Sequence, residues 1–422
     1  MDTLEQFGVA YQPRTLDGSL RAALHTAGAV VIEGPRACGK TMTASNTAAS
    51  FALLDDPASQ QLLELSPQAL LTGDAPRLLD EWQLAPQLWN LVRRAVDMSG
   101  SAGRFILTGS AVPADDVTRH SGAGRFLRLR QHTMAWHERY AGDGVSLSAL
   151  LAGEPVEPDT HTIDYATVIA RLVEPGFPGM LRIEPAHRRS AIEAYLSEIT
   201  RTDIDQVGMV RHDPAVVRRL LAAVARNSAA PVSYATLARD TDAIAPGIKD
   251  TTIATYIRLL ERLFIVDRQQ VWTPRLRSRA RLRARDKLHL ADPSLAVVAL
   301  GADADRLTHD PETAGLLFES AVFHDLSVLA TGLGGQIQHY RDSNGRELDA
   351  VLTLPDGRWA AIEVKLGAAQ IPPAARSIAA TVADIDTAAV GEPVFRLIIT
   401  GTGSAFTLDD GTITVPLHRL AP

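Results

Sequence analysis

The sequence has few of the features that mark a secreted or membrane protein. It contains one cysteine, Cys38, in 422 residues, which excludes an internal disulfide and fits a reducing cytosol. Its first residues lack the basic and apolar regions of a signal peptide, and we expect no apolar run long enough to span a membrane. Aromatic residues are 5% of the chain and the net charge is −7, so any surface for nucleic acid must be local. We therefore expect a cytoplasmic protein without a membrane partner.

The most specific motif follows a short apolar run. Val30–Glu33 predicts a buried strand, and the next residues, GPRACGKT, match G-x-x-x-x-G-K-[ST] at every fixed position. The Ala- and Thr-rich segment 40–50 predicts a helix. Glycines let backbone N–H groups surround phosphates, and a helix N-terminus adds partial positive charge. The predicted nucleotide contacts are Gly34, Pro35, Arg36, Ala37, Cys38, Gly39, Lys40, Thr41 and Met42.

The roles within this loop follow from its chemistry. We expect Lys40 to reach the β- and γ-phosphates of ATP, and the Thr41 hydroxyl to bind Mg²⁺. Cys38 is expected to be a spacer whose backbone matters, and a redox role is the alternative.

Two later segments supply groups that ATP hydrolysis requires. PRLLDEWQ predicts a strand ending in Asp80, which would hold Mg²⁺ through water, and Glu81, which would polarise the attacking water. The alternative is a solvated carboxylate pair. GRFILTGSAVP predicts a strand followed by a residue that senses the γ-phosphate, with Ser110 as first candidate and Thr108 as second. The alternative for these hydroxyls is a simple helix cap.

Arg125 precedes a predicted fifth strand in SGAGRFLRLRQ. It is a candidate to act across a subunit interface on a neighbour's γ-phosphate, and the alternative is a surface or lid contact. FALLDDP, residues 51–57, predicts the second strand. Together these segments predict a parallel α/β domain over residues 28–140, with its ligand at the C-terminal ends of the strands.

The middle of the chain predicts helices. Gly and Pro clusters in residues 141–212 predict a linker and a small helical lid. Three helices follow, the second capped by Ser233, and then a strand from about Phe264 to Trp272. Three helices followed by a strand or hairpin are typical of a winged helix, here residues 213–287. DNA binding is one interpretation, and a module used only for packing is the other.

An arginine-rich stretch, RLRSRARLRARDK, ends this part of the chain. Its alternating arginines are Arg275, Arg277, Arg279, Arg281, Arg283 and Arg285, with Lys287 next. In an extended segment, alternation puts every arginine on one face, which would follow DNA phosphates. If the segment is helical the charge spreads around it, and a basic strap pairing with acidic surface is a further alternative.

The segment RELDAVLTLPDGRWAAIEVKLG predicts a strand, a turn and a second strand. Asp349 lies on the first, while Glu363 and Lys365 lie two apart on the second and so share a face. Two carboxylates can hold Mg²⁺ and a lysine can position water, as in a metal-dependent phosphodiesterase. Glu319, on a predicted upstream helix, could complete the site. The alternatives are an intact fold that no longer cuts and a cross-strand ion pair.

Five segments in order, IEGPRACGKT, LLDEWQLAPQLW, FILTGSAVP, KLHLADPSLA and GLLFESAV, resemble the prokaryotic AAA-type ATPases that carry a C-terminal domain of unknown function 4143. The resemblance covers nearly the whole chain. It implies the ATPase roles given above for Gly34, Gly39, Lys40, Thr41, Asp80 and Glu81, and a C-terminal domain similar to restriction endonucleases. It also suggests links to DNA transactions, mobile elements, defence and toxin–antitoxin-like loci. The second sensing arginine of the AAA lid is not identifiable.

The predicted fold is α/β, with five parts: an N-terminal arm (1–27), a P-loop ATPase domain (28–140), a helical lid and linker (141–212), a winged-helix-like domain (213–287) and a nuclease-like domain (288–422). One functional hypothesis is an ATP-hydrolysing enzyme that acts on DNA with Mg²⁺. A second is a nucleotide-controlled switch, as in a toxin–antitoxin or defence-type regulator, that binds DNA or a protein and has a silent nuclease-like domain. A third is a defence-type signalling ATPase that works as a homo-oligomer through Arg125.

Overall fold

The N-terminal part of the chain is built on a parallel sheet. A computed structural model of the protein describes residues 10–112, 122–140, 144–208, 212–274 and 285–422. The five strands run in the order β2-β3-β4-β1-β5 and are all parallel. Their bounds are β1 (Ala29–Glu33), β2 (Ser50–Leu53), β3 (Arg77–Asp80), β4 (Phe105–Gly109) and β5 (Phe126–Arg130). The predicted parallel α/β domain is therefore confirmed.

Helices cover both faces of this sheet, which explains why β1 is buried at every position. Val30 and Ile32 pack with α1 (Leu16–Thr26) and α2 (Lys40–Ser45), and Val31 on the opposite face packs with α4 (Leu88–Ser99). The helix α2 is shorter than the predicted segment 40–50. Near α4 lie α3 (Pro57–Leu65) and short 3₁₀ turns at Pro67–Leu71 and Trp82–Leu84.

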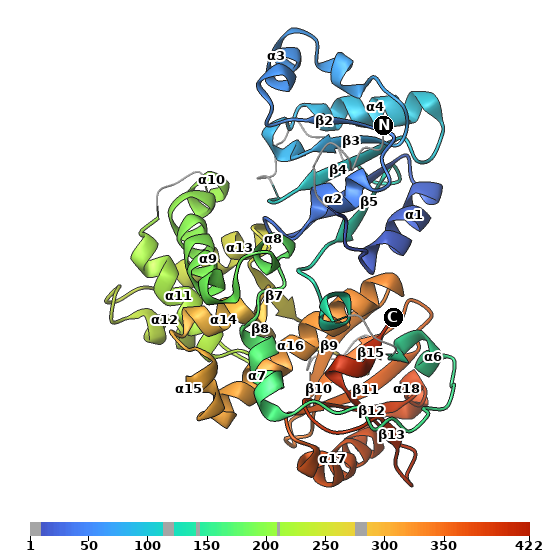
Figure 1. Cartoon of the computed structure of the whole chain (residues 1–422), viewed down its shortest axis with the longest axis vertical. Helices are drawn as coiled ribbons and strands as arrows, with labels where there is room; N and C mark the ends of the chain where they lie inside the picture. Colours follow the sequence, from blue (N-terminus) through green and yellow to red (C-terminus); the bar gives the residue numbers. More distant parts are fainter. Residues whose placement is uncertain (1–9, 113–121, 141–143, 209–211, 275–284) are drawn as a thin grey trace.

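A helical domain lies beside the first sheet (Figure 1). Its helices are α7 (Tyr165–Val173), α8 (Pro178–Leu181), α9 (Pro185–Glu198), α10 (Ile204–Gly208), α11 (Pro214–Arg226), α12 (Tyr234–Thr241), α13 (Asp250–Arg262), α14 (Pro293–Ala299) and α15 (Ala304–Thr308), with a π-helical turn at Ile199–Asp203. The helices α11, α12 and α13 pack in succession, and the predicted cap is present because Ser233 accepts a hydrogen bond from the Thr236 amide.

An antiparallel pair of strands follows α13. The strands are β7 (Val266–Gln269) and β8 (Lys287–Leu290), with Gln269 opposite Lys287. Three helices and a strand pair thus occur in the predicted order. Five arginines of the basic stretch lie outside the described residues: Arg275, Arg277, Arg279, Arg281 and Arg283.

The C-terminal domain contains a mixed six-stranded sheet, in the order β13-β14-β12-β11-β10-β9. Its elements are α16 (Pro311–Gly332), β9 (Gln336–Arg341), β10 (Glu347–Thr353), β11 (Trp359–Lys365), α17 (Ile371–Asp384), α18 (Thr387–Val390), β12 (Arg396–Thr400), β13 (Phe406–Thr407) and β14 (Ile413–Pro416), with 3₁₀ turns at Ala368–Gln370 and Leu417–Arg419. The predicted hairpin is confirmed, since β10 and β11 are antiparallel with Ala350 opposite Ile362. Side chains of α16 and α17 pack on opposite faces of the sheet.

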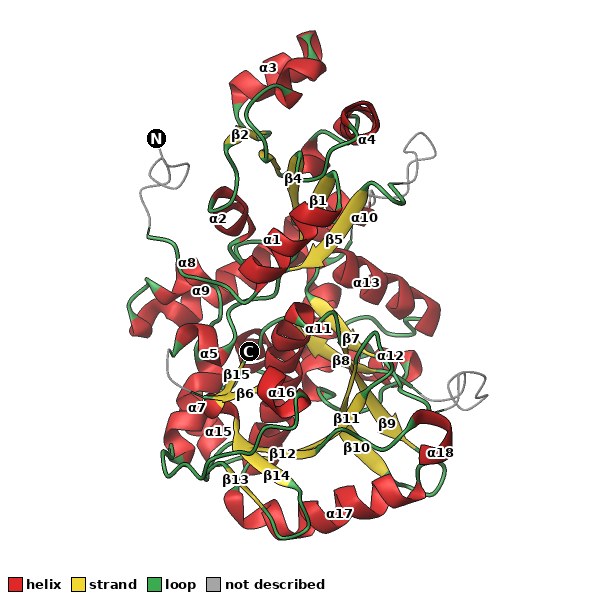
Figure 2. Ribbon diagram, turned by 90° about the vertical axis from the view of Figure 1, so that its right-hand side faces the viewer, coloured by secondary structure: helices red, strands yellow, loops and turns green. Residues whose placement is uncertain are grey.

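The helix α16 corrects one expectation from the sequence. By length and composition it is the single described helix that could cross a membrane, although no such segment was expected. However, 72% of its apolar window is buried inside the protein. It packs on the face of the C-terminal sheet opposite α17 and also contacts α1, so it serves as the core helix of this domain (Figure 2).

The segment after the first domain wraps the C-terminal domain before it enters the helical one. It includes α5 (Trp136–Arg139), β6 (Val145–Ser146) and α6 (Leu147–Leu151), and β6 pairs with β15 (Leu420–Ala421) near the end of the chain. Farther along, Asp159 forms a bridge to Ala405 and an ion pair with Arg419. Residues predicted as a linker therefore form part of the C-terminal domain's edge.

Candidate functional site

The loop between β1 and α2 is shaped by its two glycines. Gly39 has a φ of 100°, a conformation that favours glycine. A Cβ added at Gly34 would lie 2.1 Å from the carbonyl oxygen of Gln131, so no larger residue fits without a shift. The Lys40 amine is buried and donates to the carbonyls of Gly34 (3.0 Å) and Pro35 (2.8 Å). The loop thus gathers a buried positive charge and the start of a helix at the C-terminal end of β1.

The predicted metal-binding groups meet beside this loop. The Thr41 hydroxyl donates to the two carboxylate oxygens of Asp80 at 2.9 and 3.2 Å. Asp80 ends β3, and it also accepts a hydrogen bond from the Thr108 hydroxyl on β4. Burial raises the pKa of Asp80, against the opposing hydrogen bond from Thr108. A buried carboxylate next to a hydroxyl is a suitable pair of oxygen ligands for Mg²⁺.

Glu81 occupies a separate position from its neighbour Asp80. Its φ of 57° lies in the left-handed region, and this backbone turn directs it away from β3. The Glu81 carboxylate accepts a hydrogen bond from Ser110 at 2.9 Å, and the Gln83 amide donates to both residues. The structure therefore places Ser110 beside Glu81 and Thr108 beside Asp80. Gln83 was missed by sequence reasoning, because a glutamine after a strand carries no distinctive signal.

The tip of the loop contacts the helical domain. Arg36 forms an ion pair with Asp203 at 2.7 Å, and its carbonyl accepts a hydrogen bond from the Tyr195 hydroxyl at 3.2 Å. Burial raises the pKa of Asp203, and Arg36 opposes that rise. A residue of the predicted lid region thus meets the loop directly.

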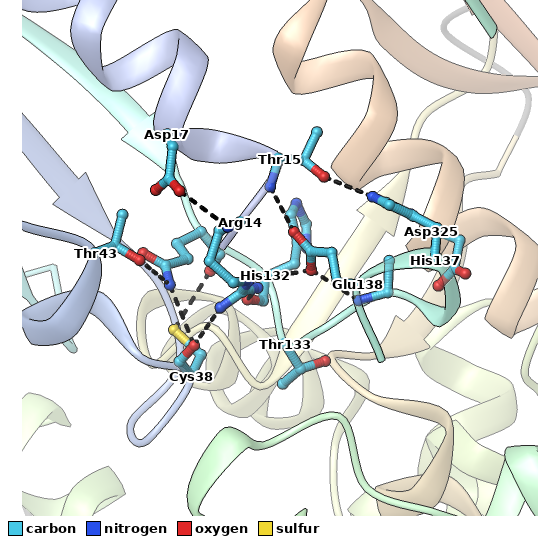
Figure 3. Close-up of polar contacts among 12 residues, drawn as sticks. Arg14, Thr15, Asp17, Cys38, Thr43, His132, Thr133, His137, Glu138 and Asp325 are labelled. Carbon is cyan, nitrogen blue, oxygen red and sulfur yellow. Dashed lines mark hydrogen bonds and ion pairs between the residues drawn. The ribbon is translucent and has the colours of Figure 1, made fainter. Parts of the chain in front are cut away.

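Arg14 connects the loop to the chain that leaves the first domain (Figure 3). Its guanidinium donates to the Cys38 carbonyl at 2.8 Å and forms an ion pair with Glu138 at 3.1 Å. The side chain of Cys38 is buried, and Gln131 also donates to its carbonyl at 3.2 Å. Sequence reasoning missed Arg14 and Gln131, since neither belongs to the loop motif.

A small cavity of about 40 Å³ lies next to the loop. Met42, one of the predicted nucleotide contacts, lines it. The cavity is bounded by the N-terminal arm, α2 and α8, through Ala10, Tyr11, Gln12, Arg14, Gly39, Met42, Thr43, Pro178 and Arg182.

Arg125 is far from the loop of its own chain. It directly precedes β5, and its carbonyl accepts a hydrogen bond from the amide of Ala29, the first residue of β1. It therefore lies at the N-terminal end of the sheet, whereas the loop follows the C-terminal end of β1. Its half-exposed side chain forms an ion pair with Asp97 at 2.7 Å. A role across a subunit interface stays a prediction.

A second group of charges converges on the C-terminal sheet. The Lys365 amine lies 2.8 Å from Glu363 and 3.4 Å from Asp349, so the three residues meet as the hairpin predicted. Asp349 and Glu363 are both buried, and Asp349 also accepts a hydrogen bond from the Val364 amide at 2.8 Å. Burial, followed by the charge of Asp349, raises the pKa of Glu363 to about 8.

Glu319 joins this group from α16, with an unexpected partner. Its carboxylate lies 2.6 Å from the amine of Lys287, which comes from β8. The Lys287 side chain is 3% exposed, so this residue is not part of a surface that follows DNA phosphates, contrary to its grouping with the arginines. Burial and the charge of Asp349 raise the pKa of Glu319 to about 7, while Lys287 opposes the rise.

The carboxylates of the C-terminal group do not form a ready-made metal cage. Among the residues that the structure describes, no three His, Cys, Asp or Glu side chains are grouped closely enough to hold an ion together. Asp349 and Glu363 offer a pair of carboxylates. A cleft of about 620 Å³ opens next to them, and Glu319, Lys365 and Tyr165 line it.

Three family models match successive parts of the chain. Residues 26–140 match the AAA domain family, residues 314–420 match a domain of unknown function (DUF4143), and residues 166–306 match another domain of unknown function (DUF8612). The AAA match contains the loop, Asp80 and Glu81, and the DUF4143 match contains Glu319 and the hairpin. The chain therefore joins an AAA-type P-loop ATPase domain to a C-terminal DUF4143 domain, which confirms the resemblance seen in the sequence.

Two mycobacterial proteins are similar to most of the chain. The chain is 27% identical over 413 residues to the uncharacterized proteins Mb2031c of Mycobacterium bovis and Rv2008c of Mycobacterium tuberculosis, covering 95% of this chain and 82% of each relative. Among solved structures, the Walker-type ATPase PABY2304 of Pyrococcus abyssi is 12% identical, with a TM-score of 0.40 over 68% of this chain and 96% of that one. The FIGL-1 AAA domain in complex with ADP is 16% identical, with a TM-score of 0.23 over 59% and 88%.

Proposed function

We propose that this protein binds ATP with Mg²⁺ at the loop of residues 34–41 and hydrolyses it. The observation that carries the proposal is the contact between the Thr41 hydroxyl and Asp80, 2.9 Å apart, at the end of β3. These two side chains would hold Mg²⁺, whose charge would offset that of the phosphates. Lys40 would leave its loop carbonyls for the β- and γ-phosphates.

The hydrolytic step is assigned to the neighbouring group. Glu81 would orient and polarise the attacking water, since its carboxylate lies just beyond Asp80 on the same turn. The Ser110 hydroxyl donates a hydrogen bond to Glu81. Ser110 would contact the γ-phosphate as well, so that the position of Glu81 would depend on whether that phosphate is bound. The nucleoside would lie toward the cavity lined by Met42, on the side of the N-terminal arm.

Phosphate release by purified protein tests this proposal. Wild type should release phosphate from ATP only with Mg²⁺ or Mn²⁺, and Lys40→Ala should lose turnover because it removes the amine that would contact the β- and γ-phosphates. Glu81→Gln should keep ATP binding and lose turnover, since it retains shape without the negative charge. Undiminished turnover in Lys40→Ala would overturn the assignment of the loop.

A second candidate activity is Mg²⁺-dependent cleavage of a phosphodiester by the C-terminal domain. The observation in its favour is the convergence of Asp349, Glu363 and Lys365 across β10 and β11, with Glu319 on α16 nearby. The two hairpin carboxylates would hold the ion. Burial, and then the charge of Asp349, raises the pKa of Glu319 and of Glu363, and a bound cation would relieve the repulsion between these carboxylates. Lys365 would position the attacking water.

DNA is the substrate or partner that the middle of the chain supports. The helices α11 to α13 with the β7–β8 pair have the order of a winged helix, and the arginine run lies between the two strands. Binding should weaken steeply with salt and with neutral replacements of Arg275 to Arg285, because phosphate contacts release counterions. A DNA affinity that does not change with salt concentration would refute DNA binding through this segment.

The competing proposal is a nucleotide-controlled switch with a silent C-terminal site. Lys287 and Lys365 already neutralise much of the acidic group, which is the observation that favours it. One paired assay separates the two: ATP hydrolysis and DNA cleavage by wild type, Lys40→Ala and Lys365→Ala, with Mg²⁺ and with Mn²⁺. Cleavage lost in Lys365→Ala with ATPase retained indicates a nuclease. ATPase without cleavage by any variant indicates the switch.

A further inference from the structure

We propose that Arg14, in the N-terminal arm, is a positioning residue of the ATPase site that fixes the peptide between Cys38 and Gly39. The inference rests on the proposed binding of ATP at this loop. It assigns a function to a segment that the loop motif does not include.

All three guanidinium nitrogens of Arg14 donate to groups around the loop. One terminal nitrogen donates to the Cys38 carbonyl at 2.8 Å, and the other donates to the His132 carbonyl at 2.9 Å. The remaining nitrogen pairs with Glu138 at 3.1 Å. Arg14 is 7% exposed, and its planar fork fixes these acceptors relative to one another.

Glu138 offsets the cost of burying the positive charge of Arg14, because the two side chains form an ion pair. Besides Arg14, its carboxylate accepts hydrogen bonds from the amides of Thr15 (2.7 Å) and Ala135 (3.0 Å). A buried charge is tolerated when it is paired and hydrogen-bonded on all sides. The guanidinium is thus held among Glu138, the Cys38 carbonyl and the His132 carbonyl by the protein's own groups (Figure 3).

The consequence for the loop follows from the planarity of the peptide bond. In a trans peptide the carbonyl and the next N–H point in opposite directions. Holding the Cys38 carbonyl against Arg14, with Gln131 as a second donor at 3.2 Å, turns the Gly39 N–H to the opposite side of that peptide. Backbone N–H groups are what such loops offer to phosphates.

Glycine makes this support necessary. Gly39 has a φ of 100°, and glycine adopts both signs of φ with little difference in energy. The loop itself therefore sets only a weak preference for the orientation of the 38–39 peptide. The two side-chain donors supply the preference from outside the motif.

The test compares ATP and ADP affinity in full-length wild type, Arg14→Ala, Arg14→Lys and Arg21→Ala. Arg21 is an exposed arginine on the same helix-bearing segment, so Arg21→Ala is the matched control. Hydrogen bonds from charged groups are the stronger ones, so Arg14→Ala should weaken binding of both nucleotides about tenfold to hundredfold. Arg21→Ala should bind as wild type does.

Arg14→Lys separates positioning from folding. Lysine keeps the charge next to Glu138, but a single ammonium cannot reproduce the fork between the Cys38 and His132 carbonyls. We expect it to fold with a cooperative melting transition a few degrees below that of wild type, because the two carbonyls lose donors, and to lose at least about fivefold in affinity, with kcat at saturating ATP within about twofold. Wild-type affinity in Arg14→Lys overturns the proposal. If Arg14→Ala fails to fold, Arg14→Lys alone decides.

Failure of the proposed function looks different. If wild type itself does not bind ATP, the assignment of the loop fails and Arg14 has no nucleotide to position. If wild type binds ATP and Lys40→Ala does not, the loop assignment holds, and equal affinity in wild type and both Arg14 variants refutes only the positioning role.

Discussion

Replacing Glu363 by glutamine should make the C-terminal domain more stable in alkaline solution. Glu363 is 3% exposed, and its carboxyl group lies next to Asp349. Burial and then the charge of Asp349 raise its pKa from the ordinary 4.5 to about 8, although Lys365 lies 2.8 Å away and opposes the rise. Glutamine has nearly the same shape and no charge, so it resembles the protonated acid.

The sign and size follow from proton linkage. An acid whose pKa is higher in the folded state binds its proton more tightly there, so the stability it contributes is present below pH 4.5 and is lost as pH rises to about 8. Each pKa unit corresponds to about 1.4 kcal/mol. The rise from 4.5 to about 8 therefore limits the loss of folding stability on ionisation of Glu363 to about 5 kcal/mol. Glutamine does not ionise, so Glu363→Gln does not lose this stability. We expect its free energy of unfolding to exceed that of wild type by about 1–3 kcal/mol at pH 8.5.

Thermal unfolding of the full chain between pH 5 and pH 9 measures this effect. The melting temperature of Glu363→Gln should exceed that of wild type by several degrees at pH 8.5, and the difference should vanish near pH 5. Glu312→Gln, an exposed replacement on α16, should show no such trend. A wild type that is more stable than Glu363→Gln at pH 8.5 would refute the reasoning, because the ionised carboxylate would then be stabilising.

Three further predictions concern other residues. Lys40→Ala should reduce phosphate release from ATP to background, and retained turnover would contradict the loop assignment. Lys287→Met should lower stability by about 3–5 kcal/mol because it leaves the Glu319 carboxylate buried without its partner; the double variant with Glu319→Gln should recover most of this in denaturant unfolding, and an equally unstable double variant would argue against the pair. Gly34→Ala should weaken ATP binding more than tenfold because its Cβ would lie 2.1 Å from a backbone oxygen, whereas Gly18→Ala, with open space around it, should bind normally.

The sequence predicted the loop and the strands beside it because their signals are local. The loop motif joins a buried strand to a helix within about a dozen residues, and Asp80 ends a short apolar run. Such patterns report periodicity and turn chemistry directly. The position of Arg14 could not be obtained in this way, since its acceptor Cys38 lies 24 residues away and Glu138 lies 124 residues away.

In the C-terminal group, too, the sequence predicted local neighbours and missed a contact between residues far apart in the chain. Alternation in a strand placed Glu363 and Lys365 on one face, and the register, with Ala350 opposite Ile362, brought Asp349 to them. The same alternation gave a wrong prediction for Lys287. It continues the spacing of the arginines and was grouped with them on an exposed face, yet its side chain is buried. Its environment is set by Glu319 on a helix that begins more than twenty residues later, and sequence spacing carries no information about that contact.

The β7–β8 pair contacts both the ATPase domain and the C-terminal candidate site through charged and polar side chains. On one side, Asp267 of β7 forms an ion pair at 2.6 Å with Arg130, at the end of β5 in the ATPase domain. On the other side, Lys287 of β8 holds Glu319, and Gln269 of β7 donates to the carbonyl of Asp349 at 2.8 Å. Packed elements that contact two domains are one route by which energetic coupling between their sites is carried. The β7–β8 pair is such an element, because it contacts the ATPase domain through Arg130 and the C-terminal group through Glu319 and Asp349.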